Sequence, residues 1–179
     1  MKIIEGTVDE IVEYQNRTAG MASASETAQE PDGNEPPTAV TAEHGLDGED
    51  GFYIKQHVFT RASDPGVARR VFEYLEDLPA GTKLEIGTSE RTADGWSDYL
   101  MVRDDGPQRF GAVVYVLPHS GRLTFRLRPD DVADLDDNGV VERNVAAKQK
   151  YAIRCMLDDD ARIPLARTLT ERALKLVRQ

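Results

Sequence analysis

Residues 109–128 read RFGAVVYVLPHSGRLTFRLR, two largely apolar runs joined by the turn sequence PHSG. In the second run Leu123, Phe125 and Leu127 alternate with polar or charged residues. That two-residue period is typical of a strand with one buried face. A turn containing Pro and Gly between two such runs is typical of a hairpin. The stretch therefore predicts a pair of antiparallel strands.

Similar patterns continue on both sides of this hairpin. Alternating segments occur near residues 83–86 and 99–102 before it and at 151–157 after it. Two amphipathic helices flank them, one beginning at Asp64-Pro65 and one at Pro164. The sequence therefore predicts an α+β fold, a mainly antiparallel sheet of about five strands with an N-terminal and a C-terminal helix packed on it. For residues 52–60 the pattern does not distinguish a strand from a helix.

The charge of the chain is unevenly distributed. The formal net charge is −10, and residues 1–50 hold two of the 22 bases and twelve of the 32 acids. Residues 16–50 contain no Phe, Trp or Tyr and are rich in Pro, Gly and small polar residues, a composition that predicts a disordered acidic linker. Residues 51–179 have balanced charge and are predicted to form the globular α+β domain.

The first 15 residues are predicted to be a short β/helix docking element. Thr7 to Glu10 match a capping box, and Val8, Ile11 and Val12 follow with helical spacing. A helix of about two turns is not stable alone in water. We therefore expect Val8, Ile11 and Val12 to dock, either on the same molecule or on a protein partner.

Several classes of protein are excluded by what the sequence lacks. No stretch approaches the roughly 20 apolar residues of a membrane span, and the first residues lack the apolar region of a secretory signal. Cys155 is the one cysteine and has the inward parity of a strand, so it is expected to be a buried thiol. No nucleotide-binding or metalloprotease motif is present. These observations predict a cytoplasmic protein with no membrane partner and no cofactor.

Acidic clusters leave an enzymatic alternative open. Asp134, Asp136 and Asn138 match the start of a calcium-binding EF-hand loop, but Val145 occupies the position of the bidentate Glu. The run Asp158 to Asp160 directly precedes a helix start, where acids are favoured without any metal. We expect no metal site. A metal-dependent hydrolase using Asp130, Asp131, Asp134 and Asp136, or Asp158 to Asp160, is the alternative.

Basic residues have the opposite parity to the apolar residues of the strands. With Leu123, Phe125 and Leu127 inward, their neighbours point to the other face, and the same holds in the last strand if Tyr151, Ile153 and Cys155 face inward. If the two strands are neighbours, these residues form a basic platform for a phosphate backbone, extended by residues of the preceding strand. The predicted polyanion-binding residues are Arg109, Tyr115, Arg122, Arg126, Arg128, Lys150 and Arg154. The alternative is a plain solvated face, in which Glu85, Asp98 and acids of residues 130–142 neutralise these bases.

The order of these elements resembles a known family. The helix ending at Leu78-Pro79, the segment QRFGAV at 108–113, the strand LTFRL at 123–127 and the strand at 151–157 are similar in order and spacing to MmcQ/YjbR-like small α+β proteins and related uncharacterised bacterial domains. The resemblance covers residues 65–178. It implies a bacterial, non-catalytic binding protein, since DNA binding is proposed for some members.

Together these observations predict a non-enzymatic binding module. Its basic sheet face would bind nucleic acid or another polyanion, and the acidic N-terminal tether would compete for that face. The alternative within the same class is a protein–protein adaptor that binds its partner through residues 3–15. The oligomeric state is not predicted.

Overall fold

The computed structural model describes residues 38–42, 46–105, 111–135, 141–143 and 150–179. Contacts divide the chain into two units, 1–35 and 36–179, and every described residue belongs to the second. Within the described residues the sheet has seven strands in the order β1-β2-β3-β4-β5-β7-β6, and every neighbouring pair is antiparallel. The strands are β1 Val40–Ala42, β2 Thr82–Thr88, β3 Trp96–Asp104, β4 Ala112–Leu117, β5 Arg122–Phe125, β6 Val141–Arg143 and β7 Ile153–Met156. The predicted α+β class is confirmed.

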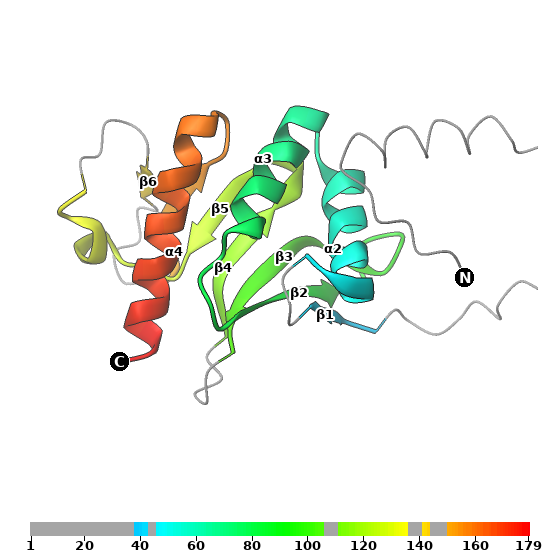
Figure 1. Ribbon diagram of the computed structural model, residues 1–179, viewed down its shortest axis with the longest axis horizontal. Coiled ribbons are helices and arrows are strands. Elements are labelled where there is room, and N and C mark those ends of the chain that lie inside the picture. The colour runs from blue at the N-terminus through cyan, green and yellow to red at the C-terminus, as the bar shows by residue number, and fades with distance from the viewer. Residues whose placement is uncertain (1–37, 43–45, 106–110, 136–140, 144–149) are drawn as a thin grey trace, which may run out of the picture. The chain divides into compact units, whose positions relative to one another are not determined.

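Three helices lie side by side across one face of this sheet (Figure 1). They are α2 Gly48–Arg61, α3 Pro65–Glu76 and α4 Ile163–Val177. Asp64 caps α3 by accepting a hydrogen bond from the Val67 backbone N–H at 3.0 Å, and Pro65 occupies the first turn, as the sequence predicts. Between the helices and the sheet lies one core, in which Tyr74, Leu123 and Phe125 are fully buried. None of the described helices combines the length and the apolar character that a membrane span needs.

The hairpin predicted from residues 109–128 is present as β4 and β5. The PHSG sequence forms the single turn η1 Pro118–Ser120 followed by Gly121, which has a φ of 65°. A left-handed φ favours glycine, because a Cβ there would be strained. The local turn chemistry therefore agrees with the observed pairing of Tyr115 with Thr124 and of Leu117 with Arg122.

The domain begins earlier than predicted. Residues 52–60 are helical as part of α2, whose buried residues Gly51, Ile54 and Val58 recur at helical spacing. The predicted boundary at residue 51 falls inside α2, and β1 pairs with β2 inside the segment predicted as a disordered linker. That prediction is therefore wrong for residues 40–42 and 46–50, because a three-residue strand is too short to show a period and depends on β2 for its hydrogen bonds. The predicted docking element with Val8, Ile11 and Val12, and the rest of the linker up to residue 37, lie outside the described residues.

Candidate functional site

The sheet face opposite α2, α3 and α4, here called the open face, is not covered by any described helix. One row of residues crosses it in register, with Glu85 opposite Met101, Met101 opposite Tyr115, Tyr115 opposite Thr124 and Thr124 opposite Arg154. All five residues of the row are half-buried, whereas the residues beside them in the strands face the core and are buried. The open face therefore carries the polar residues of the sheet.

Three predicted arginines gather at one end of this row. Arg154 lies beside Thr124, and Arg122 precedes Thr124 by two residues on β5. Arg126 follows β5, and its backbone N–H donates to the Val113 carbonyl at 2.8 Å, so the alternation continues past the strand end. Since adjacent strands are about 4.8 Å apart and alternate residues of a strand about 7 Å apart, Arg122 and Arg126 each start about 8 Å from Arg154 and about 14 Å from each other. Four of the residues predicted from sequence, these three and Tyr115, are thus brought together.

The other three predicted residues are placed differently. Lys150 is exposed, and its ammonium lies 5.7 Å from the centroid of the Tyr151 ring. Arg128 is exposed beyond the paired part of β5, where its backbone N–H donates to the Asp131 carboxylate at 2.7 Å at the start of the single turn η2 Pro129–Val132. Arg109 lies outside the described residues.

Three tyrosine rings form a row on the open face. The Tyr99 and Tyr115 centroids are 5.2 Å apart with an interplanar angle of 86°, and the Tyr115 and Tyr151 centroids are 5.2 Å apart at 61°. Both contacts are edge-to-face, a preferred geometry for aromatic pairs. The Tyr151 hydroxyl donates to the Ala112 carbonyl at 2.6 Å, and burial raises the pKa of this hydroxyl. The Tyr99 side of the row is the most exposed, with 42% of that residue accessible.

The prediction that Tyr151 faces inward is wrong. β7 begins only at Ile153, and the preceding Ala152 is itself buried, with its N–H donating to the Leu127 carbonyl at 3.0 Å. Two consecutive residues therefore face the core, which reverses the parity and places the Tyr151 ring against Tyr115. Tyr99 and Arg103, which also lie on this face, were not singled out from the sequence, although the alternation with Leu100 and Val102 carries the signal.

Three of the acids expected to neutralise the basic residues have other partners. Both carboxylate oxygens of Glu85 accept from Arg103, at 2.9 and 2.8 Å. The Asp98 carboxylate lies 3.7 Å from Arg61, and Asp134 accepts a hydrogen bond from Arg172 at 2.9 Å. In register, Glu142 of β6 lies opposite Arg154 at the edge of the sheet.

Arg122 and Arg154 keep unused donors. Neither forms an ion pair within the part of the chain that the structure describes, and the Nε atom of Arg154 is buried without a hydrogen-bond partner there. Since Arg122 and Arg154 are only half-buried, their exposed guanidinium N–H groups, rather than the buried Nε, are the donors that an anion on this face would reach. The open face is thus able to accept an anion.

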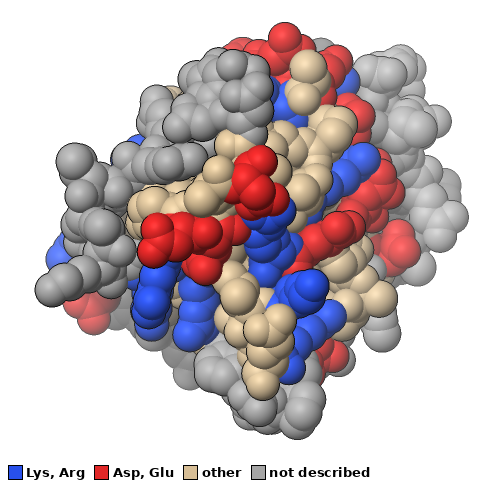
Figure 2. All heavy atoms as spheres, turned by 90° about the vertical axis from the view of Figure 1, so that its left-hand side faces the viewer, with Lys and Arg blue, Asp and Glu red and all other residues tan. Residues whose placement is uncertain are grey.

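On the side of the molecule that carries α4, most of the basic residues have acidic partners. Residues 162–179 hold five bases and one acid, but Arg167 pairs with Asp77, Arg172 with Asp134 and Arg178 with Asp104. Figure 2, which views the molecule from the left-hand side of Figure 1, shows cationic and anionic side chains lying next to one another. The excess of bases in this segment therefore makes no separate basic surface.

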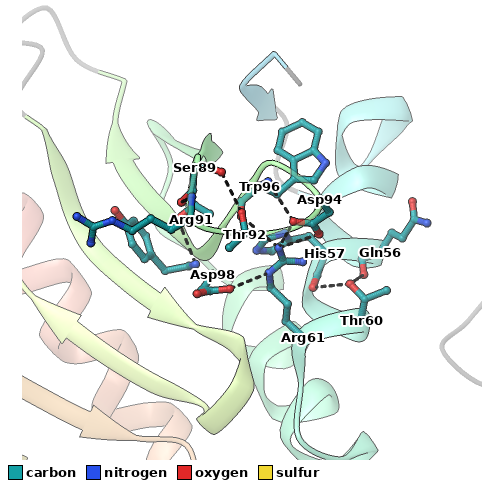
Figure 3. Close-up of polar contacts among 12 residues, drawn as sticks. Gln56, His57, Thr60, Arg61, Ser89, Arg91, Thr92, Asp94, Trp96 and Asp98 are labelled. Atoms are coloured by element: carbon teal, nitrogen blue, oxygen red, sulfur yellow. Dashed lines mark hydrogen bonds and ion pairs between the residues drawn. The ribbon is translucent and has the colours of Figure 1, made fainter. Parts of the chain in front are cut away.

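A second polar cluster joins α2 to the turn between β2 and β3 (Figure 3). The Nη2 atom of Arg61 donates to both Asp94 carboxylate oxygens, at 3.0 and 2.9 Å, and to the Trp96 carbonyl at 3.2 Å. His57 beside it is 6% exposed, and burial together with the Arg61 charge lowers its pKa to about 4. These contacts hold the turn against the helix and leave His57 neutral, so we assign the cluster a structural role.

The acidic residues Asp158 to Asp160, which precede α4, form ion pairs and hydrogen bonds with other residues of the fold. Asp158 pairs with Arg162, Asp160 pairs with Arg69, and the Asp159 carboxylate caps the Ala161 N–H at 3.1 Å. Among the described residues, no group of three His, Cys, Asp or Glu is arranged to hold a metal ion. Asp136 and Val145 lie outside the described residues. Cys155 is fully buried, as predicted, and burial raises the pKa of its thiol to about 11.

Comparison of the chain with protein-family models, with curated proteins and with solved structures finds no match. The resemblance to MmcQ/YjbR-like proteins therefore stays a prediction.

Proposed function

We propose that this protein is a non-enzymatic module that binds nucleic acid through the open face of its sheet. The observation that carries the proposal is the group formed by Arg122, Arg126 and Arg154, with Lys150 close by. Three of the acids predicted to neutralise these bases, Glu85, Asp98 and Asp134, pair with residues other than Arg122 and Arg154. The donors that Arg122 and Arg154 leave unused suit phosphate oxygens, which accept charge-assisted hydrogen bonds from guanidinium groups.

The net charge of −10 does not contradict this proposal. Residues 51–179 contain equal numbers of bases and acids, and phosphate binding depends on the local arrangement of cations rather than on the total charge. Each cation that neutralises a phosphate releases a counterion, so the affinity falls as salt concentration rises. Salt dependence is therefore the signature to measure.

The experiment compares two double variants of the full chain by fluorescence anisotropy with a labelled oligonucleotide at 50–300 mM KCl. Arg122→Ser/Arg154→Ser removes two cations from the open face, and Lys55→Ser/Lys175→Ser removes two from helices on the other side of the sheet. We expect the first variant to lose at least tenfold in affinity at 50 mM KCl and to reduce the slope of log K against log salt by about 1.5, because each phosphate contact on a single strand contributes about 0.7. We expect the control variant to bind like the wild type.

Equal losses in the two double variants, or no binding by the wild type at 50 mM KCl, would overturn the proposal. A third variant tests the edge of the face. Glu142 is the register partner of Arg154, and Glu142→Gln removes one negative charge at that position of the chain. We expect this variant to bind the oligonucleotide about two- to fivefold more tightly at low salt, because the carboxylate that it removes repels the negatively charged phosphates.

A protein–protein adaptor is the second candidate, and one observation favours it. Phe52 and Tyr53 are adjacent on α2, are 50% and 44% exposed, and their rings contact edge-to-face at 6.1 Å. Exposed aromatic pairs are common at protein contacts. They lie on the helical side of the sheet, so Phe52→Ser/Tyr53→Ser should leave nucleic-acid binding unchanged. A loss of oligonucleotide binding in that variant would contradict the assignment of binding to the open face.

A further inference from the structure

The aromatic row across the open face has no role in attracting phosphates. Tyr99 comes from β3, Tyr115 from β4, and Tyr151 from the segment just before β7, so three separate parts of the chain bring their rings into successive contact. The helical side of the sheet is packed mainly by aliphatic residues such as Leu100, Val102 and Val116, which are fully buried. The tyrosines do not belong to that core, and part of the apolar surface of their rings stays in water.

The three rings are not equivalent. Tyr151 is held by its hydrogen bond to the Ala112 carbonyl and has the Lys150 ammonium near its ring. Tyr115 lies between the other two rings and is half-buried. Tyr99 ends the row, 42% exposed, and its orientation is supported edge-to-face by Tyr115. Tyr99 is therefore the ring with surface available to a ligand and with little motion to lose on binding.

We infer that the nucleic acid bound on the open face is single-stranded, with a base stacked on Tyr99 and its phosphates at Arg122 and Arg154. This inference rests on the proposed function. A duplex turns its bases inward and presents phosphates, which have no favourable contact with the ring of Tyr99. An unpaired base has an exposed aromatic face that stacks on tyrosine, and stacking of this kind is the usual contact of sheet-based single-strand binders.

The geometry also gives the direction of the bound strand. Tyr99 lies on β3 and Arg154 on β7, three strand spacings apart, which is about 14 Å. A ligand that reaches both must run across the strands rather than along them. Its path begins at the exposed ring and ends at the arginines. Arg103 lies toward the β2 side and is paired with Glu85, so it does not compete for the phosphates.

The test uses the full chain and four probes that carry the same number of phosphate charges. They are single-stranded DNA, single-stranded RNA, a DNA duplex and inorganic polyphosphate, which has charge but no bases. Tyr99→Leu keeps an apolar side chain and removes the ring, while Tyr99→Phe keeps the ring. Because stacking on one aromatic side chain is worth roughly five- to 100-fold in affinity, we expect Tyr99→Leu to weaken single-strand binding about tenfold. We expect no change for the duplex or polyphosphate, and near wild-type binding of all probes by Tyr99→Phe.

The outcomes separate this inference from the proposed function. If Arg122→Ser/Arg154→Ser weakens every probe while Tyr99→Leu weakens none, the basic face binds polyanions and the single-strand inference is wrong. If the wild type prefers the duplex to the single strand, the inference is also wrong. If no probe binds at 50 mM KCl, both fail. Selective loss of the single-stranded probes in Tyr99→Leu, with the folded state verified by circular dichroism, supports it, and the DNA and RNA arms identify which strand is preferred.

Discussion

Tyr115 and Arg154 lie in the same cross-strand row, separated only by Thr124 of the strand between them. This relationship exists because β7 inserts between β5 and β6 in the sheet instead of following β6 at the edge. The insertion places an arginine two strand spacings, about 10 Å, from an aromatic ring on the open face. Positive charge and an aromatic surface thus meet on one side of the fold.

The first prediction concerns His57 and pH. The pKa of His57 is about 4 in the folded protein, whereas that of an unperturbed histidine, which represents the unfolded chain, is 6.5. Between pH 4 and pH 6.5 the unfolded chain therefore binds more protons than the folded one. The contribution of His57 to stability is therefore complete above about pH 6.5 and is lost as the pH falls toward 4. A difference of this size corresponds to about 3 kcal/mol. Urea denaturation from pH 7.5 to pH 4 should show this decrease.

Substitutions identify the histidine responsible. His57→Gln should flatten the decrease between pH 6.5 and 4, whereas His119→Gln, at an exposed position, should retain it. Asp64, Asp94 and Asp134 have pKa values lowered below 3.8, so their contributions are lost only at more acidic pH. An unchanged pH profile in His57→Gln would show that the buried histidine is not the titrating group.

The second prediction concerns the buried pair between α3 and α4. The Tyr74 hydroxyl lies 2.7 Å from Thr170 Oγ1, and Thr170 in turn donates to the Ala166 carbonyl at 2.8 Å, so Tyr74 is the donor to Thr170. Thr170→Val leaves the Tyr74 hydroxyl buried without a partner and should cost about 2–3 kcal/mol of unfolding free energy. Tyr74→Phe removes the donor and leaves Thr170 bonded to Ala166, so it should cost about 1 kcal/mol. Urea denaturation that ranks the two variants in the opposite order would contradict this assignment.

The third prediction concerns the C-terminal end of α4. Arg178 Nε donates to Asp104 at 2.8 Å, and its Nη2 donates to the Gly81 carbonyl at 2.9 Å. The Asp104 side chain is only 2% exposed, so Arg178→Met leaves a buried carboxylate without its cation. We expect a loss of about 2–3 kcal/mol, moderated by the partial exposure of Arg178. Asp104→Asn/Arg178→Met should recover part of it, and a double variant less stable than Arg178→Met would contradict the pairing.

Elements with local signals could be predicted from the sequence. The start of α3 follows from the Asp64 cap and Pro65, and the parity of Arg122 follows from the alternation of β5, since both depend on neighbours in the chain. β1 could not be predicted, because three residues show no period and its structure depends on pairing with β2. The position of Tyr151 could not be predicted either, because the parity changes through the hydrogen bond between Ala152 and the distant Leu127.

In the candidate site, too, some features follow from local sequence patterns and others depend on distant parts of the chain. The parity of the strands predicts that Arg122 and Arg154 share a face, provided that β5 and β7 are neighbours. The observed pairing of β5 with β7 confirms this condition. That Glu85 pairs with Arg103 rather than with these arginines depends on the register between β2 and β3. Registers between strands are set by the whole core and cannot be derived from one strand alone.

The most direct test of the account is the affinity of the wild-type chain for a single-stranded oligonucleotide as a function of KCl concentration. Three to four phosphate contacts on the open face predict that log K falls linearly with log salt, with a slope of about −2 to −3. An affinity that does not change with salt, or no binding at 50 mM KCl, would contradict the central claim that the open face of the sheet binds nucleic acid.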